Sequence, residues 1–191
     1  MKFSARSLIA CAAGATLSLS LFCAAPSAAD KPFTLTSPQL KDGGVMGTEQ
    51  VFNAFGCTGK NISPELVWSD PPKGTKSFAV TVYDPDAPTG SGWWHWVVSN
   101  IPADVRSLKL NASAGKSLPA GAVESLTDFG APGYGGACPP PGDKPHRYVV
   151  TVYALDTADI GVTPQTLPAM AGFSRYGKVL GSASLTVTYS R

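Results

Sequence analysis

The sequence is poor in charge, in histidine and in the common catalytic signatures. Only 15% of its 191 residues are charged, and it has two histidines and four cysteines. No Gly-x-Ser-x-Gly, His-Glu-x-x-His or Cys-x-x-Cys motif occurs, which argues against the hydrolase, metalloprotease and thiol-redox sites that carry them. There is also no internal repeat, heptad pattern or disordered tract. These absences leave a globular chain rich in turn residues, with 20 glycines and 17 prolines.

Long apolar runs are missing except at the amino terminus. Lys2 and Arg6 precede an apolar stretch over residues 8–22, and Ser27 and Ala29 follow in an A-x-A-like arrangement. This order is typical of a secretory signal peptide cleaved after Ala29, with cleavage one residue earlier as the neighbouring option. A membrane anchor is the alternative, but the apolar run is short for a span.

We therefore expect a signal peptide over residues 1–29 and a single domain over residues 30–191. The mature protein would be periplasmic or secreted and would have no membrane span. Neither Cys11 nor Cys23 has the setting of a lipoprotein cysteine, because Cys11 precedes any adequate apolar core and Cys23 follows bulky Phe22.

The excess of basic charge belongs to the leader. Removing residues 1–29 takes two basic residues from the 15 and leaves 13, which equals the 13 acidic residues. A chain with no net charge and no basic stripe does not have the electrostatic footprint of a nucleic-acid-binding protein. We expect no nucleic-acid partner.

Two cysteines, Cys57 and Cys138, remain after processing. Export to an oxidising compartment favours a disulfide between them. Two buried free thiols are the alternative, since cysteine is often buried without a bond.

Short segments of β-branched and aromatic residues dominate the mature chain, which indicates a mainly β protein. The best helical pattern lies late, over residues 163–180, where Leu167, Met170, Ala171 and Phe173 recur at helical spacing. We expect a single-domain β-sandwich with one or two short helices near the carboxyl terminus. The expected strands cover residues 33–36, 66–69, 77–83, 94–101, 146–155 and 182–189.

One loop between two of these strands looks like a binding site. It begins with Asp84 and Asp86, is stiffened by Pro85 and Pro88, and is followed closely by His95. Aspartate alone often serves only as a turn residue. Two acids next to prolines and a histidine favour a pocket, although a plain turn is the simpler reading of either acid by itself.

A second segment predicts the other half of the site. A loop rich in glycine and proline leads to His146 at the start of a strand, with Tyr148 on the same side of that strand. If the two strands are antiparallel neighbours, Asp84, Asp86 and His146 meet at one edge of a sheet. Arg147 points to the opposite side, where a salt bridge to an acid of the first loop would join the two segments.

Several ordered motifs carry a family resemblance. The segments DPDAP at 84–88, GSGWWHWVVSNIP at 90–102 and GGACPPPGDKPHRY at 135–148 resemble the phosphatidylethanolamine-binding protein family, also called Raf kinase inhibitor-like proteins. The segments at 61–68 and 71–80 resemble its bacterial branch. The resemblance covers residues 33–191 and implies a Greek-key-like β-sandwich with a small pocket at one edge. It also suggests a homodimer as one assembly.

The resemblance assigns roles to individual residues. It implies an anion pocket whose ligand-binding residues are Asp84, Asp86, Pro88, Trp94, His95, Gly136, Pro139, Pro140, His146 and Tyr148. The glycines of the second loop would offer exposed amides to an anion. Trp96 stands where the second of the family's two adjacent histidines is expected, which leaves any role for such a pair in doubt.

Three functions follow, from different classes. The first is a non-enzymatic binding protein, with no cofactor and no metal, for phosphate, phosphoethanolamine or a carboxylate. The second is an interaction module that inhibits a protease or a kinase. The third is a metal-dependent hydrolase using the two acids and two histidines. We favour the first, because the motifs of the third are missing.

Overall fold

The computed structural model describes residues 31–113 and 117–191, so the expected signal peptide lies outside the described residues. Every strand expected from the sequence forms, and two very short strands add to them. The elements are β1 Thr34–Thr36, β2 Leu66–Ser69, β3 Ser77–Asp84, β4 Trp93–Pro102, β5 Ser107–Leu108, β6 Val123–Glu124, β7 His146–Leu155, α1 Pro168–Arg175 and β8 Val179–Tyr189.

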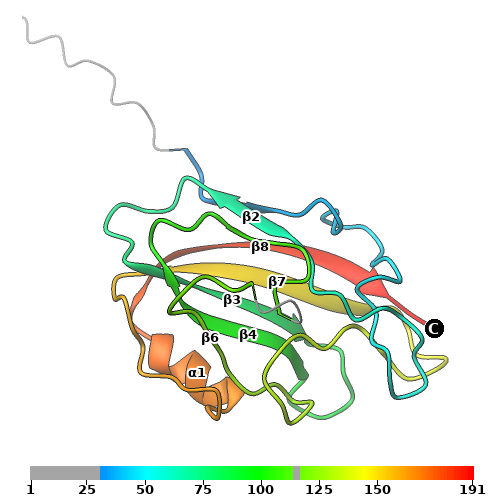
Figure 1. Ribbon diagram of the computed structural model, residues 1–191. Coiled ribbons are helices and arrows are strands. Elements are labelled where there is room, and N and C mark those ends of the chain that lie inside the picture. Colours follow the sequence, from blue (N-terminus) through cyan, green and yellow to red (C-terminus); the bar gives the residue numbers. More distant parts are fainter. Residues whose placement is uncertain (1–30, 114–116) are drawn as a thin grey trace, which may run out of the picture.

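The strands form two antiparallel sheets that pack as a sandwich (Figure 1). The larger has five strands in the order β6-β4-β3-β7-β8, and the smaller has three in the order β1-β2-β5. Strand β7 lies between β3 and β8, which explains why both of its faces are apolar or aromatic. The predicted fold class, a mainly β sandwich with one short helix near the carboxyl terminus, is confirmed.

The main core fills the space between the two sheets. Alternation along each strand sends every second side chain inward, so Trp68 of the small sheet packs on Phe78 of the large one with ring centroids 5.3 Å apart. Other fully buried members come from the central strands of the large sheet: Val80, Val82, Trp96, Val98, Tyr148, Val150 and Val152. This core fixes the central strands and therefore the loops at their ends.

The outer face of the large sheet carries the helix. Pro168 stands in the first turn of α1, where its missing amide hydrogen has no cost. The helix therefore begins four residues after the Pro164 expected to start it. Only Pro168 and Ala171 are buried, whereas Met170, Phe173 and Tyr176 are 52%, 72% and 82% exposed. Within the described part of the chain, no helix has the length and apolar character needed to cross a bilayer.

One end of the large sheet gathers the chain segments that the sequence singled out. Antiparallel pairing places the end of β3, the start of β4 and the start of β7 together, because Asp84 pairs with Trp93 and Tyr83 pairs with Val149. These strand ends lie on the right of Figure 1, near the marked carboxyl terminus, while α1 lies on the left. The proposed site thus sits at the end of the sandwich that lacks the helix.

Candidate functional site

A cavity of about 230 Å³ opens at this end of the large sheet. Three segments form it: the loop after β3, the start of β4 and the loop that leads into β7. Its lining residues are Phe55, Asp84, Ala87, Pro88, Thr89, Trp93, His95, Phe129, Cys138, Pro139, Pro140, His146 and Tyr148. Seven of the ten ligand-binding residues predicted from the sequence therefore face one cavity, and Asp86, Trp94 and Gly136 do not.

Asp84 is the buried acid of the cavity. Its Oδ1 accepts the backbone N–H groups of Asp86 at 2.8 Å and Ala87 at 3.1 Å, which is the local turn that aspartate favours. Its Oδ2 lies 2.8 Å from Nδ1 of His146, and both side chains are about 5% exposed. The acid thus has a turn role and a pocket role at once, and it holds the His146 ring in place.

His146 lies between two carboxylates. Its Nδ1 faces Asp84, and its Nε2 is 3.4 Å from Oδ2 of Asp143, which comes from the loop before β7. Asp143 was not singled out from the sequence, although it lies three residues before His146. Both ring nitrogens are therefore directed to oxygens of the protein, and the ring serves mainly to connect the two loops.

His95 reaches the cavity because β4 has a bulge. Val82 of β3 pairs with Trp96 while Tyr83 pairs with Trp94, so His95 is the extra residue between two pairs. A bulge changes the direction of side chains on its strand and is frequent beside binding sites. His95 consequently turns to the cavity, where its ring packs edge-to-face on Phe129 and Tyr148 at centroid distances of 5.3 and 5.1 Å.

The hydrogen bond of His95 fixes its tautomer. Nδ1 lies 2.7 Å from the carbonyl oxygen of Gly135, and since a carbonyl only accepts, Nδ1 carries the proton. Burial lowers the pKa of His95, and the Gly135 carbonyl and the Asp84 carboxylate only partly oppose that effect. The ring is therefore neutral at physiological pH, and its Nε2 has a lone pair.

The bulge also corrects the prediction for the tryptophans. Trp93 lines the cavity, whereas Trp94 packs on Tyr83 on the outer face of the sheet, with ring centroids 4.4 Å apart. Trp96 is fully buried in the core and donates its Nε1–H to Glu124 at 2.6 Å. The pocket wall assigned to Trp94 belongs to Trp93, and the position of Trp96 does not face the cavity.

Tyr148 is fully buried at the wall of the cavity, and its hydroxyl lies near the carboxylate of Asp84 without a well-aligned hydrogen bond to any described residue. Burial raises the pKa of Tyr148, and the nearby Asp84 carboxylate adds to that effect. The group is therefore a neutral hydroxyl. Buried polar atoms are nearly always paired, so a water or a ligand atom in the cavity is the expected partner of this hydroxyl.

Asp86 belongs to the outside of the site. Its carboxylate accepts the backbone N–H of Arg147 at 2.8 Å, and its two oxygens accept Nε and Nη2 of the same residue at 2.9 and 2.7 Å. These bonds lower the pKa of Asp86 to about 2. The salt bridge expected for Arg147 is thus formed, and it joins the loop after β3 to the start of β7 instead of facing a ligand.

The second loop holds the cavity by close packing. Gly136 lies against the backbone of Gln50, where an added Cβ would come within 2.2 Å of the carbonyl oxygen. The amide of Gly136 donates to Oδ1 of Asn61 at 2.7 Å, and the amide of Gly135 donates to the carbonyl of His95 at 2.9 Å. The predicted anion nest of glycine amides is therefore absent, because both amides already have acceptors within the protein.

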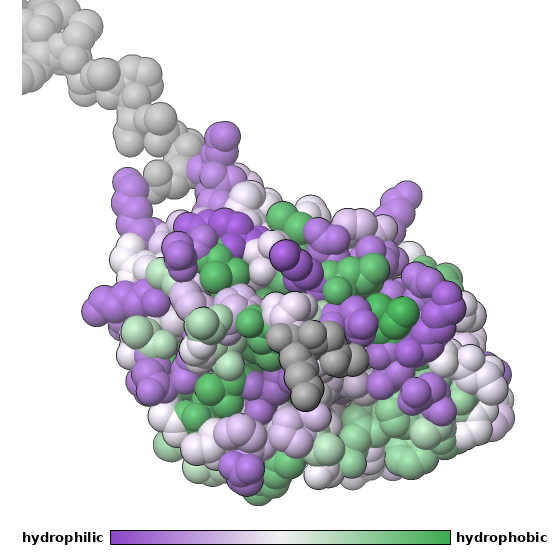
Figure 2. Space-filling view, in the orientation of Figure 1, coloured by the Kyte–Doolittle hydropathy of each residue, from purple (hydrophilic) through white to green (hydrophobic). Residues whose placement is uncertain are grey.

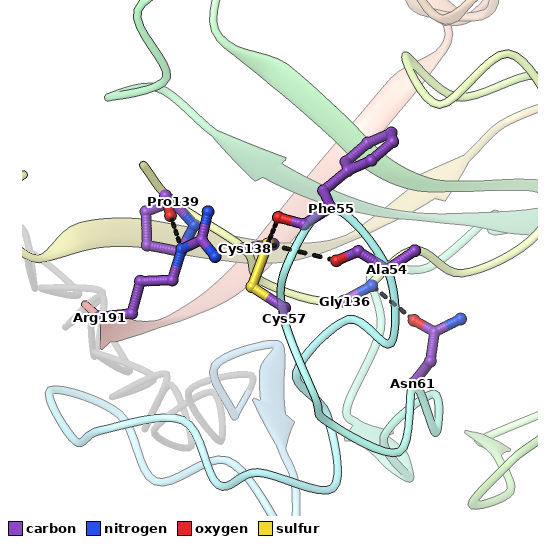
Figure 3. Close-up of a disulfide and its surroundings, with 8 residues drawn as sticks. All are labelled: Ala54, Phe55, Cys57, Asn61, Gly136, Cys138, Pro139 and Arg191. Atoms are coloured by element: carbon purple, nitrogen blue, oxygen red, sulfur yellow. Dashed lines mark hydrogen bonds between the residues drawn. A yellow bond between two sulfur atoms is a disulfide. The ribbon is translucent and has the colours of Figure 1, made fainter. Parts of the chain in front are cut away.

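A disulfide fastens this loop to another part of the chain (Figure 3). Cys57 and Cys138 are bonded, with their Cα atoms 5.9 Å apart. The carbonyl oxygens of Ala54 and Phe55 lie 3.6 and 3.7 Å from the Cys138 sulfur. The predicted bond is therefore present, and Cys138 is followed directly by Pro139 and Pro140 of the cavity wall.

The cavity has an aromatic rim that sequence reasoning missed. Phe55 and Phe129 stack with ring centroids 6.0 Å apart, and the Phe129 ring meets the edge of Trp93 at 5.4 Å. Phe55 is 67% exposed, which is unusual for a ring that could be buried. Both phenylalanines lie in irregular segments without a periodic pattern, so nothing in the sequence places them beside the motifs.

The polar groups of the cavity are mostly acceptors. Among the described residues that line it, none is lysine or arginine. The hydroxyl of Thr89 donates to the carbonyl of Gly92, and Cys138 has no free thiol. Hydrophilic residues are spread over the face shown in Figure 2, and paler, less polar ones gather at its lower right, the side of these loops in Figure 1. The site is a largely apolar hollow with a few fixed polar groups.

Metal binding has no ready ligand set. In residues 31–113 and 117–191, no three His, Cys, Asp or Glu side chains are grouped as they would be around a metal ion. The geometry instead suits a small ligand whose polar end meets Tyr148 and His95 and whose remainder contacts proline and aromatic rings.

Comparison with known proteins identifies relatives of the chain. The profile described as phosphatidylethanolamine-binding protein matches residues 36–190. YbcL of Escherichia coli, a UPF0098 protein, is 52% identical over 165 residues, which are 85% of this chain and 90% of YbcL. Its relative YbhB, also from E. coli, is 52% identical over 157 residues, covering 82% of this chain and 99% of YbhB.

A solved structure and a more distant relative extend these matches. The crystal structure of E. coli YbcL, described as a new member of the mammalian PEBP family, has a TM-score of 0.81 and covers 83% of this chain and 98% of its own. LppC of Mycobacterium tuberculosis, a putative lipoprotein, is 36% identical over 133 residues, which are 70% of this chain and 60% of LppC. The resemblance inferred from the motifs, including the bacterial branch, is confirmed.

Proposed function

Because the chain belongs to the phosphatidylethanolamine-binding protein family, we propose that it is a non-enzymatic binding protein that holds a small anionic head group in the cavity at the end of its large sheet. The head group is a phosphate, a phosphoethanolamine or a carboxylate. No cofactor takes part. The observation that carries this proposal is the Tyr148 hydroxyl, which is buried at the cavity wall without a well-aligned hydrogen bond to any described residue.

The arrangement of the polar groups supports binding over catalysis. The Asp84–His146 pair has the composition of an acid–base pair, but the second nitrogen of His146 faces Asp143 and not a serine, threonine or cysteine. The hydroxyl of Thr89 is directed to a backbone carbonyl. A nucleophile activated by hydrogen bonding to a histidine is therefore missing from the described lining residues.

Export supports the same role. The disulfide between Cys57 and Cys138 is the kind of bond that persists outside the cytosol. One relative, LppC, is named as a putative lipoprotein. We propose that the mature protein works in the periplasm or outside the cell, where the ligand would be met in extracytoplasmic fluid.

Calorimetric titration of the oxidised protein tests the proposal. Phosphate, phosphoethanolamine and acetate are added separately, and a thermal shift assay is run with each. We expect saturable heat and a raised melting temperature with at least one of them, because ligand that binds only the folded state stabilises it. The absence of heat and of any shift with all three would contradict the proposed function.

Two neighbouring tryptophans supply a matched control. Trp93→Ala removes a wall of the cavity and is expected to weaken binding, whereas Trp94→Ala acts on the opposite face of the same strand. Trp94→Ala should lower stability and leave the affinity of the folded protein unchanged. Equal losses of affinity in both variants would show that the heat does not arise in this cavity.

One observation favours a second candidate, a protein-interaction module directed at a protease or a kinase. Met170 and Phe173 of α1 and Tyr176 just after it are exposed to solvent, and α1 lies at the opposite end of the large sheet from the marked carboxyl terminus in Figure 1. Such a face suits a protein partner, and a second copy of the chain is one such partner. A partner protein captured from periplasmic extract by the wild type, but not by a Met170→Ser, Phe173→Ser variant, would support this function. Native mass spectrometry would distinguish this case from a homodimer.

A further inference from the structure

The cavity of the proposed function presents a hydrogen-bond acceptor, a nitrogen of His95, to its ligand. Nδ1 of His95 donates to the Gly135 carbonyl, so Nε2 is the nitrogen that remains for the cavity, and it has no hydrogen-bond partner among the described residues. A neutral imidazole nitrogen without a hydrogen is an acceptor. The group best placed to meet a ligand beside Tyr148 therefore accepts a hydrogen bond and does not donate one.

The surroundings of His95 keep it in this form. Asp84 approaches from the end of β3, Tyr148 and His146 from β7, and Asp128 from the segment that bonds to the backbone of Trp94. The carboxylates favour a charged imidazole, but complete burial has the larger effect in the other direction and lowers the pKa of His95. A ligand thus meets a lone pair at His95 and a hydroxyl at Tyr148.

Fixed positive charge for a fully ionised anion is missing. The described residues that line the cavity include no lysine or arginine, and the amides of Gly135 and Gly136 donate within the protein. Asp84 is acidic and already accepts three hydrogen bonds. An anion that brings only acceptor oxygens would place one of them against the lone pair of His95.

We propose that the cavity selects weak oxyacids in a singly protonated form. The acidic O–H of the ligand donates to Nε2 of His95, and another ligand oxygen accepts from the hydroxyl of Tyr148. Singly protonated phosphate monoesters and phosphonates bring this O–H together with a negative charge, and carboxylic acids bring it only in their neutral form, whereas sulfates and sulfonates lack it. The proton stays on the ligand, so no covalent step and no change in the protonation of His95 are involved.

This ligand class extends the proposed function and depends on it. The selection has a simple physical basis. A ligand that leaves a buried polar group of the site without a hydrogen-bond partner binds much more weakly than a similar ligand that supplies one. Methylphosphonate and methanesulfonate are nearly equal in size, and singly protonated methylphosphonate has the same charge as methanesulfonate. They differ in the one O–H group that His95 would accept.

The test is calorimetry with these two probes on the full, oxidised protein. We expect methylphosphonate to bind at least about tenfold more tightly than methanesulfonate at pH 6, as one unpaired buried acceptor predicts. We also expect the affinity for methylphosphonate to fall about tenfold for each pH unit above the second pKa of the ligand, where the doubly charged form dominates. Equal affinity for the two probes, or an affinity that does not change with pH, would overturn the selection while leaving the proposed function in place.

The remaining outcomes separate this inference from the proposed function. If neither probe, nor phosphate or acetate, gives heat at any pH, the anion site itself is wrong. If ethanolamine binds and methylphosphonate does not, the cavity is a site for amines and both proposals fail. A His95→Gln variant, whose amide offers a donor, should bind methanesulfonate more tightly than the wild type. If that variant does not fold, the comparison of the two probes on the wild type still tests the selection.

Discussion

At Tyr148, one substitution is expected to weaken ligand binding without lowering the stability of the protein. The Tyr148 hydroxyl is buried and makes no well-aligned hydrogen bond, only a weak contact with Asp84, so Tyr148→Phe removes a polar group that contributes little to the fold. We expect the free energy of unfolding to stay the same or to rise by up to about 1 kcal/mol. The affinity for methylphosphonate is expected to fall at least about tenfold, measured by urea denaturation and calorimetry on the same preparation.

Tyr134 is the matched control for this prediction. It is also a buried tyrosine, but its hydroxyl donates to the carbonyl of Gln50 at 2.7 Å and does not line the cavity. Tyr134→Phe should therefore cost about 1 kcal/mol of stability and leave the affinity unchanged. Loss of stability in Tyr148→Phe equal to that in Tyr134→Phe would mean that the Tyr148 hydroxyl has a partner in the free protein.

Asp86 gives the protein a pH dependence of its own. Its pKa in the folded state is about 2, below the ordinary value of 3.8, so it contributes stability above that ordinary value and loses the contribution as pH falls through 2. Asp86→Asn should make the melting temperature less sensitive to pH between 4 and 2 than it is in the wild type. The effect is small, because the ion pair with Arg147 is partly exposed.

Arg147→Gln tests the cause of this shift. Without the guanidinium, the pKa of Asp86 returns part of the way to its ordinary value, because the backbone N–H of residue 147 still donates to it, and the pH profile of the variant should lie between those of the wild type and Asp86→Asn. The double variant should be no flatter than Asp86→Asn. A profile for Arg147→Gln that matches the wild type would show that other groups hold the carboxyl of Asp86 in its ionised form.

Among the elements, the loop that carries Pro139 and Pro140 depends most on one covalent bond. The disulfide joins residues 81 positions apart, and closing a loop of this length is expected to stabilise the folded state by about 4 kcal/mol. The Cys57→Ser, Cys138→Ser variant should lose stability of that order in urea denaturation, and reduced wild type should behave alike. A variant as stable as the oxidised wild type would show that the loops hold their positions without the bond.

Strand β4 shows where prediction from the sequence ends. Its existence and length follow from the run of aromatic and β-branched residues, but its register does not. Strict alternation places Trp94 and Trp96 on one face, whereas the bulge at His95 sends Trp94 outward and Trp96 into the core. The bulge depends on how β4 packs against β3, and the sequence pattern of β4 alone does not reveal it.

The two loops of the site were predictable to different degrees. Asp84 and His146 were identified because they stand at the ends of strongly patterned strands, and antiparallel pairing brings such ends together. Gly136 was predicted to bind a ligand, and the structure shows instead its close approach to the backbone of Gln50, which leaves no room for a side chain. Phe55 and Phe129 were missed, because only the folded chain brings those irregular segments to the cavity.

For the whole molecule, composition and strand pattern were sufficient to predict the sandwich. The large sheet buries both faces of its central strands, one against the small sheet and the other against α1 and the segment before it. That arrangement leaves one end of the sheet free of the helix, and the cavity forms there. Fold and site location were therefore linked. The proposed selection of the ligand depends on which atoms of His95 and Tyr148 carry hydrogen, which the sequence pattern does not show.

The placement of Trp93 has a practical consequence. Trp68 and Trp96 are sealed in the interior and Trp94 faces away, so an occupant of the cavity touches the indole of Trp93 alone among the four. Intrinsic fluorescence should then carry a constant background from three emitters and a signal from the fourth. Intrinsic tryptophan fluorescence should therefore report ligand binding in the cavity without a dye, label or engineered residue.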